Sequence, residues 1–385
     1  MSPLVAGVGS TPFGKHPTSS TRELFGEAAT TALEDAGITR DHIDGLYVGN
    51  FIGDITDDQA HVGAMMADML GVPEVSAARL ESACASASAA ARSGEQAIIA
   101  GDADAVIVGG VEMMFQAGIQ QVTDALANAA DNEYENEIGL TFPGIYALMA
   151  RAYMAAFEVT KEELASVAVK ARANGVKNPH SQIKTETTVE AVLESPMIAS
   201  PLNLQDCCPI TDGASAAVLV SDAFADEQGL DPTVAFVGSG HAGDSLALHD
   251  RPDLTELAAG RRAAEAAYAA AGITADDVDV AEVHDCFTIA ELLAIEALGF
   301  ADRGQAMAAT LDGRTAVDGP IPVNPSGGLL AKGHPVGATG VAQLVEVTKQ
   351  LEGRHPNQVD DPAIGLTHTV GGSGASCVVN VFRGR

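Results

Sequence analysis

The chain has 385 residues, and 52 acidic against 21 basic side chains give a formal net charge of -31. Nucleic-acid binding needs a basic footprint, so this composition argues against that class of function. Hydrophobic residues make up 46% of the chain, enough for a close-packed core in one large α/β unit or in two or three domains. The acidic excess is typical of a solvated surface adapted to a salt-rich cytoplasm.

The cysteines and the N-terminus indicate an intracellular environment. Five cysteines in a chain of this length do not form a disulfide framework, and they contain no CxxC pair that would indicate zinc. We therefore expect reduced thiols, no metal site and a cytoplasmic location. The first 15 residues lack the positive segment of a signal peptide, and no apolar stretch approaches 18 residues, so we expect no membrane span.

Taken in chain order, the predicted strands alternate with helices, which favours an α/β fold with buried, mostly parallel sheets. Residues 32–51 and 267–287 share alanines, A-G-I-T, an acidic turn and an apolar stretch, and this similarity indicates an internal duplication. The predicted strands lie near residues 4–8, 45–50, 76–81, 104–110, 215–222, 233–239, 279–284, 363–369 and 375–382.

The alternation is lost over residues 112–205, where helical runs such as YALMARAYMAAF and KEELASVAVKARANG predict an inserted loop domain. We accordingly divide the chain into an N-terminal half, the inserted loop domain, a strand returning to the first half, and a C-terminal half. These segments are residues 1–118, 119–205, 206–225 and 226–385.

The stretch ESACASASAAARSGEQ, residues 81–96, places Cys84 between a predicted strand and the start of a helix made of small residues. A helix start carries partial positive charge and unpaired N–H groups, which lower the pKa of a thiol. A buried structural cysteine is the alternative, and this stretch alone does not decide between the two.

The segment EVHDCF, residues 282–287, places His284 and Cys286 directly after an apolar stretch. Polar groups so close to a core strand cost free energy unless they are paired or functional. Two residues apart in an extended strand, the two side chains would face the same side of the sheet. Both are therefore candidates for an active site.

The segment NPSGGLLAKGHPVGATG, residues 324–340, surrounds His334 with five glycines ahead of a long helix. So many glycines indicate close backbone approach or unusual φ angles, which favours a functional histidine over an exposed loop residue. A second glycine-rich turn follows a predicted strand at Gly371, and its N–H groups could bind an anion. Such positions, at strand ends and helix starts, are where ligands bind in open α/β sheets.

Nearly the whole chain resembles the thiolase superfamily, most specifically in GHPVGATG, SACAS and TDGASAAVL (211–219). HDCF stands where other thiolases carry Asn-Glu-Ala-Phe, and it is similar to sterol-carrier-protein-type and archaeal thiolases. The opening GVGSTPFGK and the segment KNPHSQIK resemble the same branch. The resemblance implies two duplicated halves in a five-layered α/β/α/β/α arrangement, and subunits that pair across their sheets.

The resemblance also implies roles for the candidate residues. Cys84 would take an acyl group from coenzyme A (CoA), and His334 would activate that thiol and help to hold the thioester oxygen of the second substrate. His284 would order a water in the same oxyanion hole. The N–H groups of Cys84 and Gly371 would form the hole for the acyl-enzyme.

One departure from the bacterial biosynthetic thiolases concerns their second catalytic cysteine, since Thr369 stands at that position here. A hydroxyl is too weak a base, so Cys286 is the candidate acid/base. We interpret Cys377 as a core residue, and Cys207 and Cys208 as buried packing residues.

A Claisen condensation needs a covalent acyl acceptor, a base and donors for an enolate oxygen, and these residues supply all three. We predict a thiolase that makes or cleaves 3-ketoacyl-CoA and requires no metal or redox cofactor. One alternative is a ketoacyl synthase or hydroxymethylglutaryl-CoA synthase. The other is a non-catalytic acyl-CoA-binding, lipid-binding or scaffold protein on this fold. Acyl chain length and physiological direction stay open.

Binding partners follow partly from charge and partly from the resemblance. CoA is anionic, so we expect its phosphates at the densest basic stretch, although a solvated helix face is the alternative there. The resemblance implies a homodimer or a dimer of dimers, and a small zinc-ribbon/OB-fold partner protein. The predicted CoA contacts are Lys161, Lys170, Arg172, Lys177 and Lys184.

Overall fold

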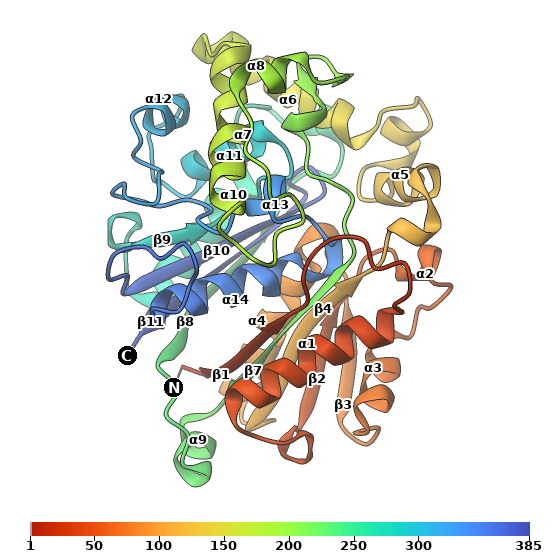
Figure 1. Cartoon of the computed structure of the whole chain (residues 1–385), viewed down its shortest axis with the longest axis vertical. Helices are drawn as coiled ribbons and strands as arrows, with labels where there is room; N and C mark the ends of the chain where they lie inside the picture. Colours follow the sequence, from red (N-terminus) through yellow and green to blue (C-terminus); the bar gives the residue numbers. More distant parts are fainter. Residues whose placement is uncertain (1) are drawn as a thin grey trace.

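A computed structural model describes residues 2–385. Within these residues, nine strands form one hydrogen-bonded sheet in the order β3-β2-β4-β7-β1-β8-β11-β10-β9 (Figure 1). Every strand predicted from the sequence is present. The strands are β1 (Leu4–Ser10), β2 (Gly45–Gly49), β3 (Ser76–Leu80), β4 (Ala105–Glu112), β7 (Gly213–Val220), β8 (Val234–Gly243), β9 (Val280–Glu282), β10 (Ile364–Gly371) and β11 (Ser376–Gly384).

The strand order repeats in the two halves, which supports the internal duplication. In the first half the order is β3-β2-β4-β7-β1; the second half runs β9-β10-β11-β8, and a parallel bridge from Ala281 to Val323 stands at the place that β3 occupies. The halves are joined where Leu4 and Val5 of β1 pair with Ala235 and Val234 of β8.

The expectation of mostly parallel strands is wrong. Within the nine-stranded sheet of the described residues, three strand pairings are parallel and five are antiparallel. The last strand of each half, β7 in the first and β11 in the second, is antiparallel to both of its neighbours. In the second half β10 and β11 are joined by a short turn, which only an antiparallel pair allows.

Two helices lie between the halves and complete the layers. Helix α4 (Ser86–Ala100) of the first half packs against α14 (Thr339–Leu351) of the second. Their contact is close: a Cβ at Gly340 would lie 2.2 Å from Ser88 Oγ, so only glycine fits there. Outside, α1 (Thr21–Ala36) covers the first half and α10 (Ala258–Ala271) the second (Figure 1). The predicted α/β/α/β/α arrangement is confirmed.

Between β4 and β7 the chain leaves the sheet and builds the inserted segment. Helix α7 (Lys161–Gly175) of this segment packs on α11 (Thr288–Ala297) and α13 (Gly328–Ala331), above the second half (Figure 1). The division of the chain at residues 118, 205 and 225 stays a prediction. The inserted elements are α5 (Ile119–Ala127), α6 (Phe142–Phe157), α7 (Lys161–Gly175), α8 (Val189–Glu194), β5 (Met197–Ala199) and β6 (Leu202–Asn203).

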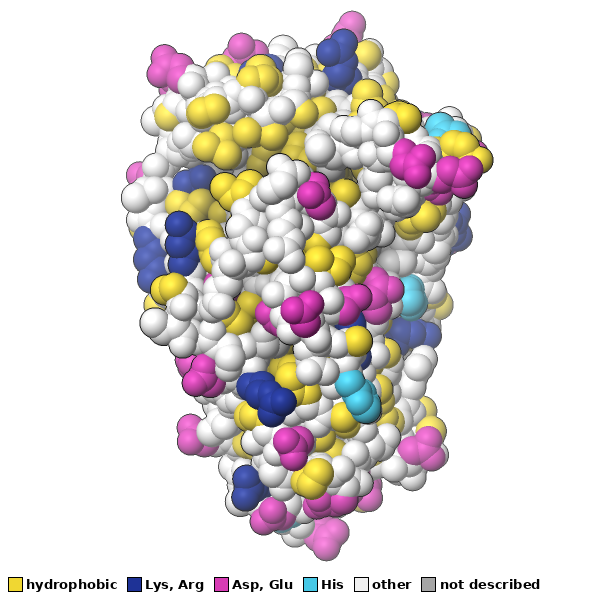
Figure 2. Space-filling view, turned by 90° about the vertical axis from the view of Figure 1, so that its right-hand side faces the viewer, with side chains coloured by type: hydrophobic (Ala, Val, Ile, Leu, Met, Phe, Trp, Pro, Cys, Tyr) yellow, Lys and Arg dark blue, Asp and Glu magenta, His cyan; other side chains and the backbone are white. Residues whose placement is uncertain are grey.

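The surface carries the acidic excess. Figure 2 shows acidic side chains spread over one face of the molecule, with fewer basic side chains among them, some of which lie together at the left edge. In residues 2–385, each helix is too short or too polar to cross a bilayer.

Candidate active site

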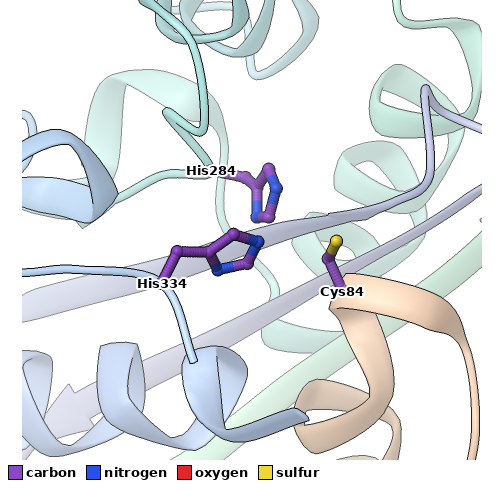
Figure 3. Close-up of side chains that lie close together, drawn as sticks. All are labelled: Cys84, His284 and His334. Atoms are coloured by element: carbon purple, nitrogen blue, oxygen red, sulfur yellow. The ribbon is translucent and has the colours of Figure 1, made fainter. Parts of the chain in front are cut away.

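A small apolar pocket of about 70 Å³ lies where both halves meet the inserted segment. Cys84, Cys286 and His334 line it, together with aromatic and aliphatic side chains. His284 lies close by: its ring, the ring of His334 and the Cys84 sulfur place their ligand atoms within 4.8 Å of one another (Figure 3). The structure therefore brings together four predicted site residues that are up to 250 positions apart, from Cys84 to His334.

Cys84 is held by a strained turn. Ala83 has a φ of 48°, in the left-handed region that costs a non-glycine residue free energy and that is found often at active sites. The Ala83 N–H donates to Glu81 Oε1 at 2.6 Å, which helps to fix this conformation. Cys84 follows in a single helical turn directly ahead of α4.

Burial decides the protonation of the Cys84 thiol. Loss of solvent raises its pKa to about 12, although a hydrogen bond from the Gly372 N–H acts in the opposite direction. The expectation that the helix start lowers this pKa is therefore wrong for the unliganded protein, because desolvation outweighs the helix. The thiol is neutral, and a base must remove its proton during the reaction.

His334 has the tautomer of such a base. Its Nδ1 lies 2.7 Å from Thr339 Oγ1, and that hydroxyl donates its single proton to the Pro335 carbonyl at 3.0 Å. Thr339 must therefore accept from Nδ1–H, which leaves the lone pair of His334 on Nε2. Burial lowers the pKa of His334 to about 3, so the imidazole is neutral.

His284 and Cys286 come from the loop after β9, which ends two residues before His284. The rings of His284 and His334 meet edge to face, with centroids 5.0 Å apart and planes at 83°. His284 is fully buried, and its ring nitrogens have no hydrogen-bond partner within residues 2–385. Burial lowers its pKa well below the usual range, and burial also raises the pKa of Cys286.

The two acids of EVHDCF have a different task, because they hold the segment that carries His334. Glu282 accepts hydrogen bonds from the Ser326 N–H at 3.0 Å and from its hydroxyl at 2.6 Å. Asp285 accepts from the Leu329 N–H at 2.6 Å. The four polar residues of this motif thus divide into two that lie at or beside the pocket and two that position a neighbouring loop.

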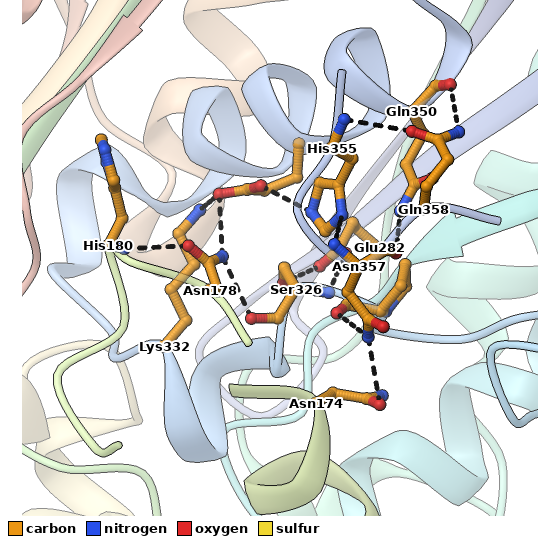
Figure 4. A network of polar contacts seen from close by, with 12 residues as sticks. Asn174, Asn178, His180, Glu282, Ser326, Lys332, Gln350, His355, Asn357 and Gln358 are labelled. Atoms are coloured by element: carbon orange, nitrogen blue, oxygen red, sulfur yellow. Dashed lines mark hydrogen bonds and ion pairs between the residues drawn. The ribbon is translucent and has the colours of Figure 1, made fainter. Parts of the chain in front are cut away.

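Behind the pocket, a buried polar network fixes the same segment (Figure 4). Glu346 on α14 lies between two basic groups, with Lys332 Nζ at 2.6 Å and His355 Nε2 at 2.9 Å. Asn178 of the inserted segment donates to the Ser326 carbonyl at 3.1 Å and to Glu346 at 3.3 Å. The network ties α14, the inserted segment and the His334 loop together.

Glu112 is a site residue that the sequence did not reveal. Its carboxylate is fully buried at the end of β4 and accepts N–H bonds from Phe51 and Gly337, both at 2.9 Å. Phe51 lines the pocket, and Gly337 follows His334 in the next helical turn. Burial raises the pKa of Glu112 to about 7. The only signal in the sequence is an acid at the end of an apolar strand.

The turn after β10 presents a different glycine from the predicted one. Gly372 lines the pocket, and its N–H is the one that reaches the Cys84 sulfur. Gly371 is the last residue of β10, and a Cβ there would lie 2.4 Å from the Ser82 carbonyl oxygen. Gly371 therefore allows the close approach of the Cys84 turn.

Two other cysteine interpretations can be compared with the structure. Cys207 and Cys208 both pack against the hydrophobic core, as interpreted, and Cys208 in addition lines the pocket. Its N–H donates to the Cys286 carbonyl at 2.9 Å, which holds the two segments side by side. Cys377 is buried on β11 and is not part of the pocket lining. Thr369 also faces the protein interior, where its hydroxyl donates to Gln343 at 2.9 Å.

The basic residues predicted to bind CoA lie on α7 or shortly after it, outside the pocket lining. Arg172 is buried, whereas Lys184 is exposed and donates to the nearby Pro179 carbonyl at 2.8 Å. The remaining three have partners within the protein: Lys161 (Asn203 Oδ1, 2.8 Å), Lys170 (Glu291 Oε1, 2.7 Å) and Lys177 (Asn357 Oδ1, 3.0 Å).

Comparison with known protein families decides the family. The model of the thiolase N-terminal domain matches residues 4–223, and that of the thiolase C-terminal domain-like region matches residues 240–384. This chain belongs to the thiolase family. As a thiolase it is an acyltransferase, and the Cys84, His284 and His334 cluster lies where both matched regions meet.

Several relatives are similar to this thiolase over most of their length. An acetyl-CoA acetyltransferase of Methanothermobacter thermautotrophicus is 44% identical, covering 98% of each chain. Benzoylsuccinyl-CoA thiolase subunit BbsB of Thauera aromatica is 34% identical over 96% of this chain and 94% of its own. Human sterol carrier protein 2 is 32% identical over 99% of this chain and 71% of its own.

Among solved structures, the chain is similar to the Ltp2-ChsH2(DUF35) aldolase. The TM-score is 0.84 at 26% identity, and the match covers 98% of this chain and 97% of that one.

Proposed function

We propose that this thiolase condenses two acetyl-CoA molecules to acetoacetyl-CoA and CoA, or runs the reverse thiolysis, through an acetyl group on Cys84. The observation that supports it most directly is the neutral thiol–imidazole pair beside a small apolar pocket. A volume of about 70 Å³ corresponds to roughly two water molecules, which suits an acetyl group. The acetyl-CoA acetyltransferase name of the methanogen relative points to the same substrate.

In the first half-reaction, the Cys84 sulfur attacks the thioester carbon and its proton passes to Nε2 of His334. The bond from carbon to the CoA sulfur breaks, and the departing sulfur takes a proton from Cys286. This leaves acetyl-Cys84, an imidazolium at His334 and a thiolate at Cys286. The N–H groups of Cys84 and of the glycine turn hold the thioester oxygen.

In the second half-reaction, the Cys286 thiolate removes a proton from C2 of a second acetyl-CoA. The resulting enolate carbon attacks the carbonyl of acetyl-Cys84, while His334 and His284 face the enolate oxygen. The bond from carbon to the Cys84 sulfur breaks, and that sulfur recovers its proton from His334. All three groups return to their neutral forms, so the cycle needs neither a metal nor a redox cofactor.

The decisive experiment is mass spectrometry of the protein after incubation with acetyl-CoA alone in molar KCl. Intact mass should rise by one acetyl group, and peptide mapping should place it on Cys84. The Cys84→Ala variant should stay unmodified, whereas Cys208→Ala, which removes another thiol of the pocket, should still be acetylated. Acetylation of Cys84→Ala at another residue would overturn the assignment of the nucleophile.

The cellular setting and assembly complete the proposal. The acidic surface and the methanogen relatives favour a cytoplasmic enzyme of a halophilic archaeon. We propose a homodimer or dimer of dimers, and a small zinc-ribbon/OB-fold partner, because the similar aldolase has a second component by its name. Full activity of the chain alone, with no small protein co-purifying from the native host, would argue against that partner.

A further inference from the structure

Tyr146 of the inserted segment lies directly behind the catalytic pocket. It stands in the first turns of α6, it is 1% exposed, and its ring stacks on Phe287 with centroids 4.6 Å apart and planes at 28°. Phe287 is itself a pocket-lining residue and follows Cys286 in the chain. The stacking fixes the Tyr146 hydroxyl relative to the HDCF motif.

The Tyr146 hydroxyl touches two parts of the site. It donates to the Gly372 carbonyl at 3.0 Å. Gly372, Cys286 and Phe287 line the same pocket and the ring stacks on Phe287, so the hydroxyl lies near enough to the Cys286 sulfur to act on its pKa as a donor. A phenol has one proton, so it can donate to only one of these acceptors at a time. While Cys286 is a thiol, its S–H can donate to the phenol oxygen, and the phenol proton stays on the Gly372 carbonyl. When Cys286 becomes a thiolate, the phenol proton has a charged acceptor.

We propose that Tyr146 is a positioning residue that holds Cys286 at the pocket and stabilises its thiolate in the interval between the two half-reactions. The inference rests on the proposed role of Cys286. It adds that the inserted segment contributes a side chain to the chemistry, through a hydroxyl that changes partner. Because Gly372 also donates its N–H to the Cys84 sulfur, the same hydroxyl links the environments of the two reacting thiols.

The surroundings of Cys286 explain why such a donor is needed. Burial, the neighbouring thiols of Cys208 and Cys84, and the Asp285 carboxyl all raise the pKa of Cys286, whereas the hydrogen bond from Tyr146 lowers it. Tyr146 itself stays protonated, since burial raises its pKa well above the usual range. The other titratable groups that face this corner are His284, His334 and, toward Tyr146, Arg251.

The test is Tyr146→Phe, which keeps the ring and its stacking but removes the hydroxyl. Charged groups lose more than neutral ones when a hydrogen bond is removed, so condensation from isolated acetyl-enzyme should fall about tenfold. Its rate rises with pH as Cys286 ionises, and the midpoint should move up by about one pH unit. Acetylation of Cys84 forms the Cys286 thiolate only as CoA leaves and does not use it as a base, so its rate should fall less, by no more than about threefold. An unchanged midpoint and rate would overturn the proposal.

A matched control comes from the same helix. Tyr153 is equally buried, and its hydroxyl donates to Glu296, away from the pocket. Tyr153→Phe should reproduce any general effect of removing a buried hydroxyl from α6, without the shift in the pH midpoint. An equal shift in both variants would mean that Tyr146 has only a structural role.

Replacing Tyr146 with 3-fluorotyrosine, a stronger donor of nearly the same shape, should lower the pH midpoint of condensation. An unchanged midpoint would contradict the proposal even if Tyr146→Phe does not fold.

Comparison with Cys286→Ala separates the two claims. If Cys286→Ala condenses normally, the proposed role of Cys286 fails, and this inference fails with it. If Cys286→Ala loses condensation while Tyr146→Phe does not, only the Tyr146 inference fails. If both hold, the double variant should be no slower than Cys286→Ala alone, because the tyrosine acts through the cysteine.

Discussion

Two buried polar regions lie on either side of the His334 loop, and they differ in how far their polar groups are satisfied by hydrogen bonds and ion pairs. Behind the loop, Lys332, Glu346 and His355 are held by ion pairs and hydrogen bonds (Figure 4). In front of it, His284 has both ring nitrogens unpartnered among the described residues, and the thiols of the pocket face apolar walls (Figure 3).

The difference shows where stability and reactivity are located. A satisfied buried network specifies one arrangement of its segments, and removing one partner leaves a buried charge uncompensated. An unsatisfied polar group costs free energy in the unliganded protein, but it can bind a substrate oxygen without first losing another partner. Changes in the network should therefore alter stability first, and changes in the pocket should alter chemistry first.

The largest expected effect is on stability. Glu346→Ala leaves the buried Lys332 ammonium without its carboxylate, which should lower the free energy of unfolding by about 3–5 kcal/mol. Urea denaturation in molar KCl, followed by circular dichroism, measures it. The control is Glu352→Ala, which removes a more exposed ion pair with Arg354 and should cost less than about 1 kcal/mol. Equal losses in the two variants would contradict the distinction between the regions.

A change in the pocket should affect chemistry with little effect on folding. Cys286→Ala should acetylate Cys84 at a near-normal rate, because the CoA sulfur can leave as a thiolate without the proton that Cys286 gives it. It should lose condensation and thiolysis by at least about 10²-fold, since it lacks the base for C2. Separate assays of the two half-reactions measure this. Cys377→Ala, which removes a buried thiol outside the pocket lining, should change neither. Normal condensation by Cys286→Ala would move the base to His284 or His334.

The sequence predicted the strands and the main site residues because these depend on local patterns, whereas the layers followed from the resemblance to thiolases. Alternation gave every strand, and repeated glycines around His334 marked its loop. Strand direction was not predictable in the same way, because an apolar stretch does not indicate which strand it pairs with or whether the pairing is parallel or antiparallel. The parallel expectation failed where β10 and β11 form a hairpin.

The residues that the sequence missed act through distant contacts. Tyr146 is one apolar-face residue of a helix until the fold places it against Gly372, 226 positions away. Cys208 and Glu112 likewise come to the pocket only through contacts between segments of both halves. The pKa of Cys84 was misjudged for a related reason: a helix start is visible in the sequence, whereas the burial that outweighs it is not.

The pH dependence of acetylation should reflect burial in the pocket. His334 has its pKa lowered to about 3, so its imidazole remains neutral from pH 7.5 down to pH 5 and the acetylation rate should stay nearly constant. A histidine with an ordinary pKa of about 6.5 would lose about thirtyfold by pH 5. The network should hold in the same range, because the pKa of Glu346 is lowered and its stabilising charge is lost only as pH falls through that lower value. Stopped acetylation time courses with mass detection test this, and a loss centred near pH 6.5 would refute it.

The smallest effect should come from the segment that joins the two regions. Asn178 belongs to the network, and four residues later the Gln182 N–H donates to the Lys332 carbonyl at 3.0 Å, which brings Lys184 to the surface beside the His334 loop. Lys184 is exposed, whereas Lys161 donates to Asn203. If Lys184 meets the CoA phosphates, Lys184→Gln should raise KM for acetyl-CoA by about threefold to tenfold with kcat unchanged, because an exposed charge contact contributes about 1 kcal/mol of uniform binding. Lys161→Gln should leave KM as it is.

Steady-state kinetics at several KCl concentrations measure KM for both variants, and the Lys184 effect should shrink as salt screens the contact. An unchanged KM in Lys184→Gln, at low salt as well as high, would leave the stretch as a solvated face.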